Sequence, residues 1–245
     1  MDSETDKIVR QIADIILSNK QKLESGLYMG KTGIAIFLMY LWRILGNNYY
    51  YDSASELVEA EFDYLTYQSH RIIWEPTKVD LSVSEGCAGI MLGINFLTNK
   101  EWIKCPWEEV AIALDPAIFG AMLSNLHPSQ LNEFKALSFA QYALIRHTRF
   151  AREYIDRFMR EWGQGSTIGD LKEEISRHSM SAAQTLYRIS DYFISSSLSP
   201  CKWFTSYNGL YKLNYGVIGG LAGIGLSLIR KEDGYDDDWQ ECFFV

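Results

Sequence analysis

The sequence predicts an all-α protein, arranged as an α/α toroid or an open ring of about four helical hairpins. Apolar residues recur at helical spacing through most of the 245 residues. Strand-like alternation is nearly absent, apart from KVDLSVS at 78–84. A short glycine pattern recurs before apolar runs, as in folds built from repeats. No proline- or serine-rich linker divides the chain, so we expect residues 1–245 to form one domain.

The repeated pattern reads GKTGIAI at 30–36, GCAGIML at 86–92 and GLAGIGL at 220–226. Its glycines are Gly30, Gly33, Gly86, Gly89, Gly220 and Gly223. Glycines three apart share one face of a first helical turn, where the missing Cβ lets a neighbour approach closely. The runs that follow are apolar almost all round, which predicts buried inner helices.

Amphipathic segments between these runs predict outer helices. One begins near Ser3 and Asp6, a pair typical of a helix N-terminus. In 51–68 the apolar stripe comprises Ala54, Leu57, Val58, Phe62 and Leu65, and off the stripe lie Asp52, Glu56, Glu59 and Asp63. Residues 106–123 and 170–194 have the same amphipathic character.

Proline and missing glycines mark two irregular elements. Pro106 suits a helix start, whereas Pro116 predicts a kink or break within 106–123. Residues 133–149 predict a degenerate third inner helix without glycines, with Phe139, Tyr142 and Ile145 on one face. The segments 163–169 and 195–203 are interpreted as loops.

The stretch SGLYMGKTG at 25–33 raises the question of a phosphate-binding loop. That signature has four residues between its first glycine and Gly-Lys-Thr, and a buried strand before it. Here Gly26 is followed by one residue too few, and a helical pattern precedes it. Lys31 is replaced by Cys87 and Leu221 in the other copies. We therefore interpret Lys31 as incidental to the repeat.

Composition limits the classes of partner. Lys plus Arg number 23 and Asp plus Glu 31, for a net charge of −8, which disfavours binding to nucleic acids or anionic membranes. No apolar run has the length of a membrane span, and the N-terminus lacks the pattern of a signal peptide. The scattered cysteines Cys87, Cys105, Cys201 and Cys242 indicate reduced thiols, so we expect a cytoplasmic protein.

Three segments carry a family resemblance. LYMGKTGIAIFLMYLWRILGNNYYYDSASELV resembles the first repeat of lanthionine synthetase C-like proteins. SEGCAGIMLGINFLTNKEWI with WEEVAIALDPAIF resembles the second, and YGVIGGLAGIGLSLIRKEDGYDDDWQECFFV the closing repeat. The resemblance covers residues 25–125 and 215–245, with a fainter match at 134–149.

The resemblance implies an α/α toroid. In active members a central zinc, held by two cysteines and a histidine, activates a peptide cysteine for addition to a dehydrated Ser or Thr. The Trp-Cys-Tyr-Gly and Cys-His-Gly types of motif that supply these ligands are missing, and the chain contains no Cys-His dipeptide. We therefore expect a shortened ring with no metal and no cofactor. A site joining Cys201, Cys242 and His127 is the alternative; otherwise His70, His127, His147 and His178 are interpreted as surface residues.

Carboxylates and aromatics are the remaining candidates for a site. Asp80, Glu85 and Asp115 fall near the inner ends of hairpins, where paired acids would suit a glycosidase-like hydrolase and the helix dipole alone also favours acids. The segment 201–216 offers a peptide- or sugar-binding surface, or alternatively a cap on the core. Its candidate residues are Trp203, Tyr207, Asn208, Tyr211 and Tyr215.

The expected function is non-catalytic binding of a peptide, such as a substrate or leader peptide, in lantibiotic-type maturation. The alternative is an enzyme, either a cyclase with an unconventional zinc site or a carboxylate-based hydrolase. A short ring would leave the face of Tyr142 without a neighbour, which predicts a homodimer or partner contact through 134–165. Alternatively, the helix at 170–195 crosses the gap and keeps the chain monomeric.

Overall fold

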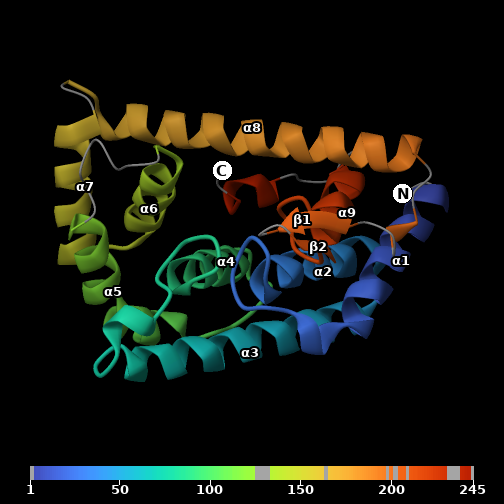
Figure 1. Ribbon diagram of the computed structural model, residues 1–245, viewed down its shortest axis with the longest axis horizontal. Coiled ribbons are helices and arrows are strands. Elements are labelled where there is room, and N and C mark those ends of the chain that lie inside the picture. The colour runs from blue at the N-terminus through green and yellow to red at the C-terminus, as the bar shows by residue number, and fades with distance from the viewer. Residues whose placement is uncertain are drawn as a thin grey trace.

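The computed structural model describes residues 3–124, 133–162, 165–196, 199–200, 204–207, 210–230 and 238–243, and within them the all-α class is confirmed (Figure 1). The helices are α1 (Ser3–Ser18), α2 (Lys31–Leu45), α3 (Asn48–Arg71), α4 (Cys87–Asn99), α5 (Trp107–Ser124), α6 (Glu133–Ile145), α7 (Arg149–Trp162), α8 (Ile168–Ser195) and α9 (Leu221–Arg230). Short 3₁₀ turns cover Lys20–Lys22, Pro76–Lys78 and Asp238–Glu241.

The glycine repeats begin three buried helices, as predicted. α2, α4 and α9 start directly after Gly30, Gly86 and Gly220. Side chains on every side of α2 are buried from Thr32 to Leu41, because α3, α4 and α9 pack around it. In Figure 1 the long helices α3 and α8 run along opposite sides of the molecule, and α2, α4, α6 and α9 lie between them.

Helix contacts lead from the start of the chain round to its end. α2 packs on α4, α4 on α6, α6 on α8, α8 on α9, and α9 returns to α2. α3 covers α2 as its hairpin partner and also contacts α4 and α5. The C-terminal repeat therefore lies beside the first one. Whether this circuit is an α/α toroid remains a prediction.

The expectation that Tyr142 faces a missing neighbour is wrong. Its side chain is fully buried and stacks on Phe119, with 5.6 Å between ring centroids. Phe139 and Ile145 are partly buried against the core. Residues 149–162 form a separate helix, α7, which packs on α5 and α6, and α8 contacts both α6 and α9. The arrangement in which the helix at 170–195 spans the gap is therefore the one observed, while the oligomeric state stays a prediction.

Pro116 neither breaks nor ends α5. The helix is continuous from Trp107 to Ser124 with Pro116 inside it. A proline removes the amide that would bond to the carbonyl four residues earlier, here that of Ile112. Pro116 and Ile112 both lie on the exposed face of the helix, so the carbonyl of Ile112 is left on the solvent side. The predicted break failed because the cost of an unpaired carbonyl depends on burial.

The aromatic segment before the last inner helix is not a simple loop. β1 (Phe204–Tyr207) and β2 (Leu210–Leu213) pair antiparallel, with Tyr207 opposite Leu210. Asn208-Gly209, which lies outside the described residues, is the strongest two-residue hairpin signal and was overlooked in a pattern dominated by helices. The loop predicted at 163–169 is shorter than expected, because α8 already begins at Ile168.

Candidate functional site

The loops before α2, α4 and α9 share one backbone geometry. In each, the first amide of the helix donates to the carbonyl seven residues earlier: Lys31 to Glu24 at 2.9 Å, Cys87 to Asp80 at 3.0 Å and Leu221 to Asn214 at 2.9 Å. The repeat seen in the sequence therefore extends to ten residues, at 24–33, 80–89 and 214–223. The positions that precede the glycine pair cannot be recognised as a repeat in the sequence, because they share a backbone path but have different side chains.

The glycines are required by this path. At the second glycine of each pair, an added Cβ would meet the carbonyl oxygen six residues earlier: Gly33 with Leu27 at 2.1 Å, Gly89 with Val83 at 1.8 Å and Gly223 with Val217 at 1.9 Å. At the first glycine the nearest atoms are also within 2.4 Å: Gly30 beside Ser25, Gly86 beside Ser82 and Gly220 beside Gly216. These contacts support the predicted structural role of all six glycines.

The three loops also bind one another in a fixed order. The amides of Leu27 and Tyr28 both donate to the carbonyl of Ser84, at 3.1 and 3.0 Å. One step further, the amides of Val217 and Ile218 both donate to the carbonyl of Tyr28, at 2.7 and 3.2 Å. The two junctions therefore use the same two loop positions as donors and the same loop position as acceptor. The closing repeat is joined to the first, and the first to the second.

A buried carboxylate anchors the first loop. Glu61 of α3 is fully buried, and its Oε1 accepts from the amide of Gly26 at 2.9 Å and from Thr32 Oγ1 at 3.3 Å. Burial raises the pKa of Glu61, while the hydrogen bond from Gly26 and the charge of Lys31 act in the opposite direction. Lys31 is therefore not wholly incidental, because its charge favours the ionised form of Glu61.

These contacts explain why the loop is not a phosphate site. A phosphate-binding loop needs free amides that point at the anion. Here the amides of Gly26, Leu27, Tyr28, Lys31 and Thr32 donate to groups of the protein itself. The segment before the loop is helix α1 and a 3₁₀ turn, as predicted, and not a strand.

Sequence reasoning missed Glu61, although a signal was present. It lies four residues after Leu57 and four before Leu65, both of which are buried on the predicted stripe of α3. An acid at such a position must be paired with donors or neutralised. Its Oε2 has no hydrogen-bond partner among the described residues.

Two of the predicted carboxylates lie in the second loop. Asp80 Oδ1 accepts from the amide of Ser82 at 2.8 Å, and Asn214 Oδ1 accepts from Gly216 at 2.9 Å in the same position of the third loop. Both are turns in which a side chain binds the amide two residues on. Asp80 therefore stabilises the loop. Glu85 is half-buried, and its backbone lies against Gly26 in the first loop.

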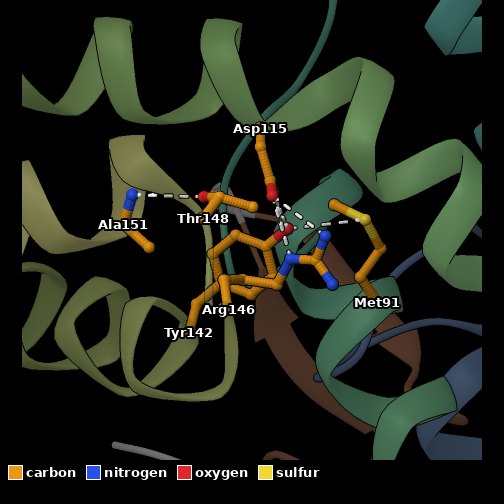
Figure 2. A network of polar contacts seen from close by, with 6 residues as sticks. All are labelled: Met91, Asp115, Tyr142, Arg146, Thr148 and Ala151. Carbon is orange, nitrogen blue, oxygen red and sulfur yellow. Dashed lines mark hydrogen bonds and ion pairs between the residues drawn. The ribbon is translucent and has the colours of Figure 1, made fainter.

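Asp115 is separated from these loops and belongs to a buried ion pair (Figure 2). Its carboxylate accepts from Arg146 Nη2 at 2.9 Å and from the hydroxyl of Tyr142 at 2.7 Å. The guanidinium of Arg146 also lies over the ring of Trp107, 5.0 Å from its centroid. Asp115 is 1 % exposed and saturated with donors, so it is placed to hold α5 to α6 and not to meet a substrate.

A cavity opens where the first and third loops meet. It measures about 220 Å³ and is lined by Lys22, Leu23, Glu24, Met29, Leu213, Asn214 and Tyr215. From the predicted binding segment 201–216 it takes in Leu213, Asn214 and Tyr215, and the side chain of Tyr215 is half-buried. Trp203 and Asn208 lie outside the described residues, and Tyr207 and Tyr211 are placed by backbone alone, in β1 and β2. Ionisable, amide and apolar side chains thus share one small cavity.

The described cysteines have the character of core thiols. Burial raises the pKa of Cys87 to about 12 and that of Cys105 to about 11, which suppresses the thiolate that a nucleophile or zinc ligand needs. Cys242 is buried. Cys201 and His127, the other members of the alternative metal site, lie outside the described residues. Within the described part of the chain, no group of three His, Cys, Asp or Glu side chains is placed to hold a metal.

Comparisons of the chain with protein-family models, with curated proteins and with solved structures gave no match. The described helices include none that is long and apolar enough to cross a membrane.

Proposed function

We propose that this protein is a shortened lanthionine synthetase C-like protein that binds a peptide without modifying it, as an accessory factor in lantibiotic-type maturation. The observation that carries the proposal is the cavity between the first and closing loops. Two segments almost two hundred residues apart in the sequence must meet to form it, through the paired amide bonds to Tyr28. Binding sites are common where separate repeats converge on one face of a fold.

The size and lining of the cavity favour the binding of a single side chain that belongs to a larger ligand. Pockets that enclose whole small molecules usually measure roughly 300–1,000 Å³, whereas this cavity measures about 220 Å³. Leu23, Met29 and Tyr215 offer apolar contact, and Lys22 and Glu24 offer charges of both signs. A peptide fits this mixture, because it presents an apolar side chain between backbone amides and carbonyls.

The raised pKa of Cys87 and the ion pair of Asp115 support binding over catalysis, since the Cys87 thiol stays protonated and the Asp115 carboxylate is occupied by Arg146 and Tyr142. A cyclase and a carboxylate-based hydrolase are the enzymatic alternatives. The cyclase is tested by incubating the protein with a fluorescent peptide that contains one cysteine and one dehydroalanine, since cyclisation leaves the peptide mass unchanged and removes its free thiol. The hydrolase is tested with an oligosaccharide, since a glycosidase-like reaction consumes one water and releases a new reducing end for each bond cleaved.

We expect fluorescence anisotropy to show that the peptide binds. After incubation the peptide thiol should still react with an alkylating reagent, and the peptide mass should be unchanged. Tyr215→Ala should weaken binding about tenfold, a loss typical of removing one aromatic contact. The matched control is Tyr192→Ala, which removes a side chain that is 62 % exposed on α8. Equal affinity of the two variants would show that the cavity is not the site, and loss of the thiol would establish the cyclase.

A further inference from the structure

A second cavity lies on the outer face, away from the loops. It measures about 770 Å³, the size of a binding groove, and runs between α3 and the linker from α4 to α5. Val58, Phe62, Trp102 and Ile103 provide its apolar lining. Glu59 and Asp63 of α3 and Glu101 of the linker provide acids on its walls, where Lys104 is the one base.

The acids of α3 extend the charge beyond the groove. Asp52, Glu56, Glu59 and Asp63 recur at helical spacing on one side of the helix. Glu56 forms an ion pair with Lys20. Among the described residues, no basic side chain forms an ion pair with Glu59, Asp63 or Glu101. The groove therefore combines an apolar lining with negative charge that the described part of the chain does not neutralise.

The backbone at Glu101 adds an independent sign of function. α4 ends in a Schellman motif, with the amide of Trp102 bonded to the carbonyl of Leu97 and the amide of Glu101 to that of Thr98. This motif places Glu101 at φ 56°, in the left-handed region where glycine is preferred. The first repeat uses Gly46 there, at φ 64°. Among the described residues, Glu101 is the one non-glycine with positive φ.

We propose that this groove, defined by Val58, Glu59, Phe62, Asp63, Glu101 and Trp102, docks a basic amphipathic segment of a partner protein. Lysines or arginines flanking apolar side chains would complement both the lining and the walls. Nucleic acids and anionic membranes are the wrong occupants, because their phosphates would meet the same acids. Glu101, at the left-handed position, adds a negative charge to the groove, which a glycine at this position would lack. The inference does not depend on the proposed function of the loop cavity.

The test measures binding of a fluorescent helical peptide made of leucine and lysine in an amphipathic pattern. The groove variant combines Glu59→Gln, Asp63→Asn and Glu101→Gln. The matched control combines Asp14→Asn, Glu153→Gln and Glu173→Gln, which removes the same charge from exposed positions on α1, α7 and α8. We expect the groove variant to bind at least tenfold more weakly than wild type, and the control to change the affinity less than threefold.

A further variant separates docking from folding. Glu101→Gly should keep or raise the melting temperature, since glycine prefers the left-handed conformation, and should weaken peptide binding severalfold. Equal weakening by the two triple variants would mean non-specific attraction to an acidic protein and would overturn the proposal. Absence of peptide binding by wild type, or equal affinity of wild type for anionic vesicles, would also overturn the proposal. Self-association of wild type that the groove variant abolishes would overturn it as well, because the occupant would then be a second copy of the chain.

Discussion

Single residues on the predicted stripes had roles that their residue type alone did not reveal. Glu61 occupies an apolar stripe position and holds the first loop through Gly26 and Thr32. Asp115, predicted as a candidate acid, is instead part of a buried ion pair. Periodicity gave the stripe of α3 that includes Leu57 and Leu65 on either side of Glu61. It could not identify the partners of Glu61 and Asp115, because Gly26 and Arg146 are more than thirty residues away along the chain.

The pKa of Glu61 predicts a pH dependence of stability. Its pKa is raised in the folded state, so the folded protein holds this proton more tightly than the unfolded chain does. Its stabilising contribution is complete below the ordinary carboxyl pKa and is lost as the pH rises through the raised value. Glu61→Gln should abolish this loss, seen as a flatter curve of unfolding free energy against pH. An unchanged curve would show that Glu61 is not the group responsible.

Removal of the acceptor should act differently from removal of the charge. Glutamine keeps an oxygen for the amide of Gly26, whereas Glu61→Ala leaves that amide and Thr32 Oγ1 without their acceptor. We expect Glu61→Ala to lower the free energy of unfolding by about 1–3 kcal/mol relative to Glu61→Gln at neutral pH. Urea denaturation of the two variants measures this difference. Equal stability would mean that the hydrogen bonds to Oε1 do not hold the loop.

The ion pair of Asp115 gives a third prediction at this scale. Arg146→Met leaves a buried carboxylate with only the hydroxyl of Tyr142, and should destabilise the protein by about 3–5 kcal/mol. The double variant Asp115→Leu with Arg146→Met removes both charges and should recover much of this loss. A thermodynamic cycle from urea denaturation tests the coupling. If the losses in the cycle simply add, the two residues do not act as a pair.

At the scale of elements, the order and type of the helices could be predicted from the sequence. Apolar runs after glycine pairs gave α2, α4 and α9, and amphipathic stripes gave α1, α3, α5 and α8. The separate helix α7 was not recognised, because Arg149–Trp162 follows α6 after only three residues and continues its helical pattern. The hairpin was missed for a different reason, since its Asn-Gly signal spans only two residues in a chain dominated by helical patterns.

Replacing glycine by alanine should have opposite effects on stability at a repeat glycine and at a helical glycine outside the repeat. Gly89→Ala would place a Cβ 1.8 Å from the backbone carbonyl of Val83, which cannot move aside cheaply. We expect a loss of about 1–3 kcal/mol or more from this overpacking. Gly120→Ala in α5 meets no atom within 4 Å and should stabilise by about 0.5–1 kcal/mol through helix propensity. Thermal unfolding that ranks the two variants the other way would refute the close approach of loop and helix.

At the scale of the whole molecule, the last residues tie back to the first half of the chain. Asp238 bonds to the hydroxyl of Tyr40 and forms an ion pair with Lys100. Trp239 is buried beside Tyr187 of α8, at 6.3 Å between ring centroids. The sequence could not show this closure, since it depends on contacts across the length of the chain. The face of Tyr142 is covered separately, by Phe119 of α5 and by the packing of α7 and α8 on α6.

Assembly therefore follows from the burial of Tyr142. Tyr142→Glu would place a charge in the core beside Phe119 and Asp115, and should unfold the protein. Wild type should sediment as a monomer at micromolar concentration, because α7 and α8 already cover α6. A dimer that Tyr142→Glu converts to a folded monomer would restore the exposed face predicted from the sequence and contradict the packing described above.

The closing repeat is joined to the first through Tyr28, which brings together the loops that form the proposed peptide site. Hydrogen exchange of the Val217 and Ile218 amides tests this junction, because both amides donate to the carbonyl of Tyr28. We predict that they exchange as slowly as the amides of Leu27 and Tyr28, which join the first two loops. If the Val217 and Ile218 amides exchange at the rate of an open loop while those of Leu27 and Tyr28 stay protected, the closing repeat is not joined to the first.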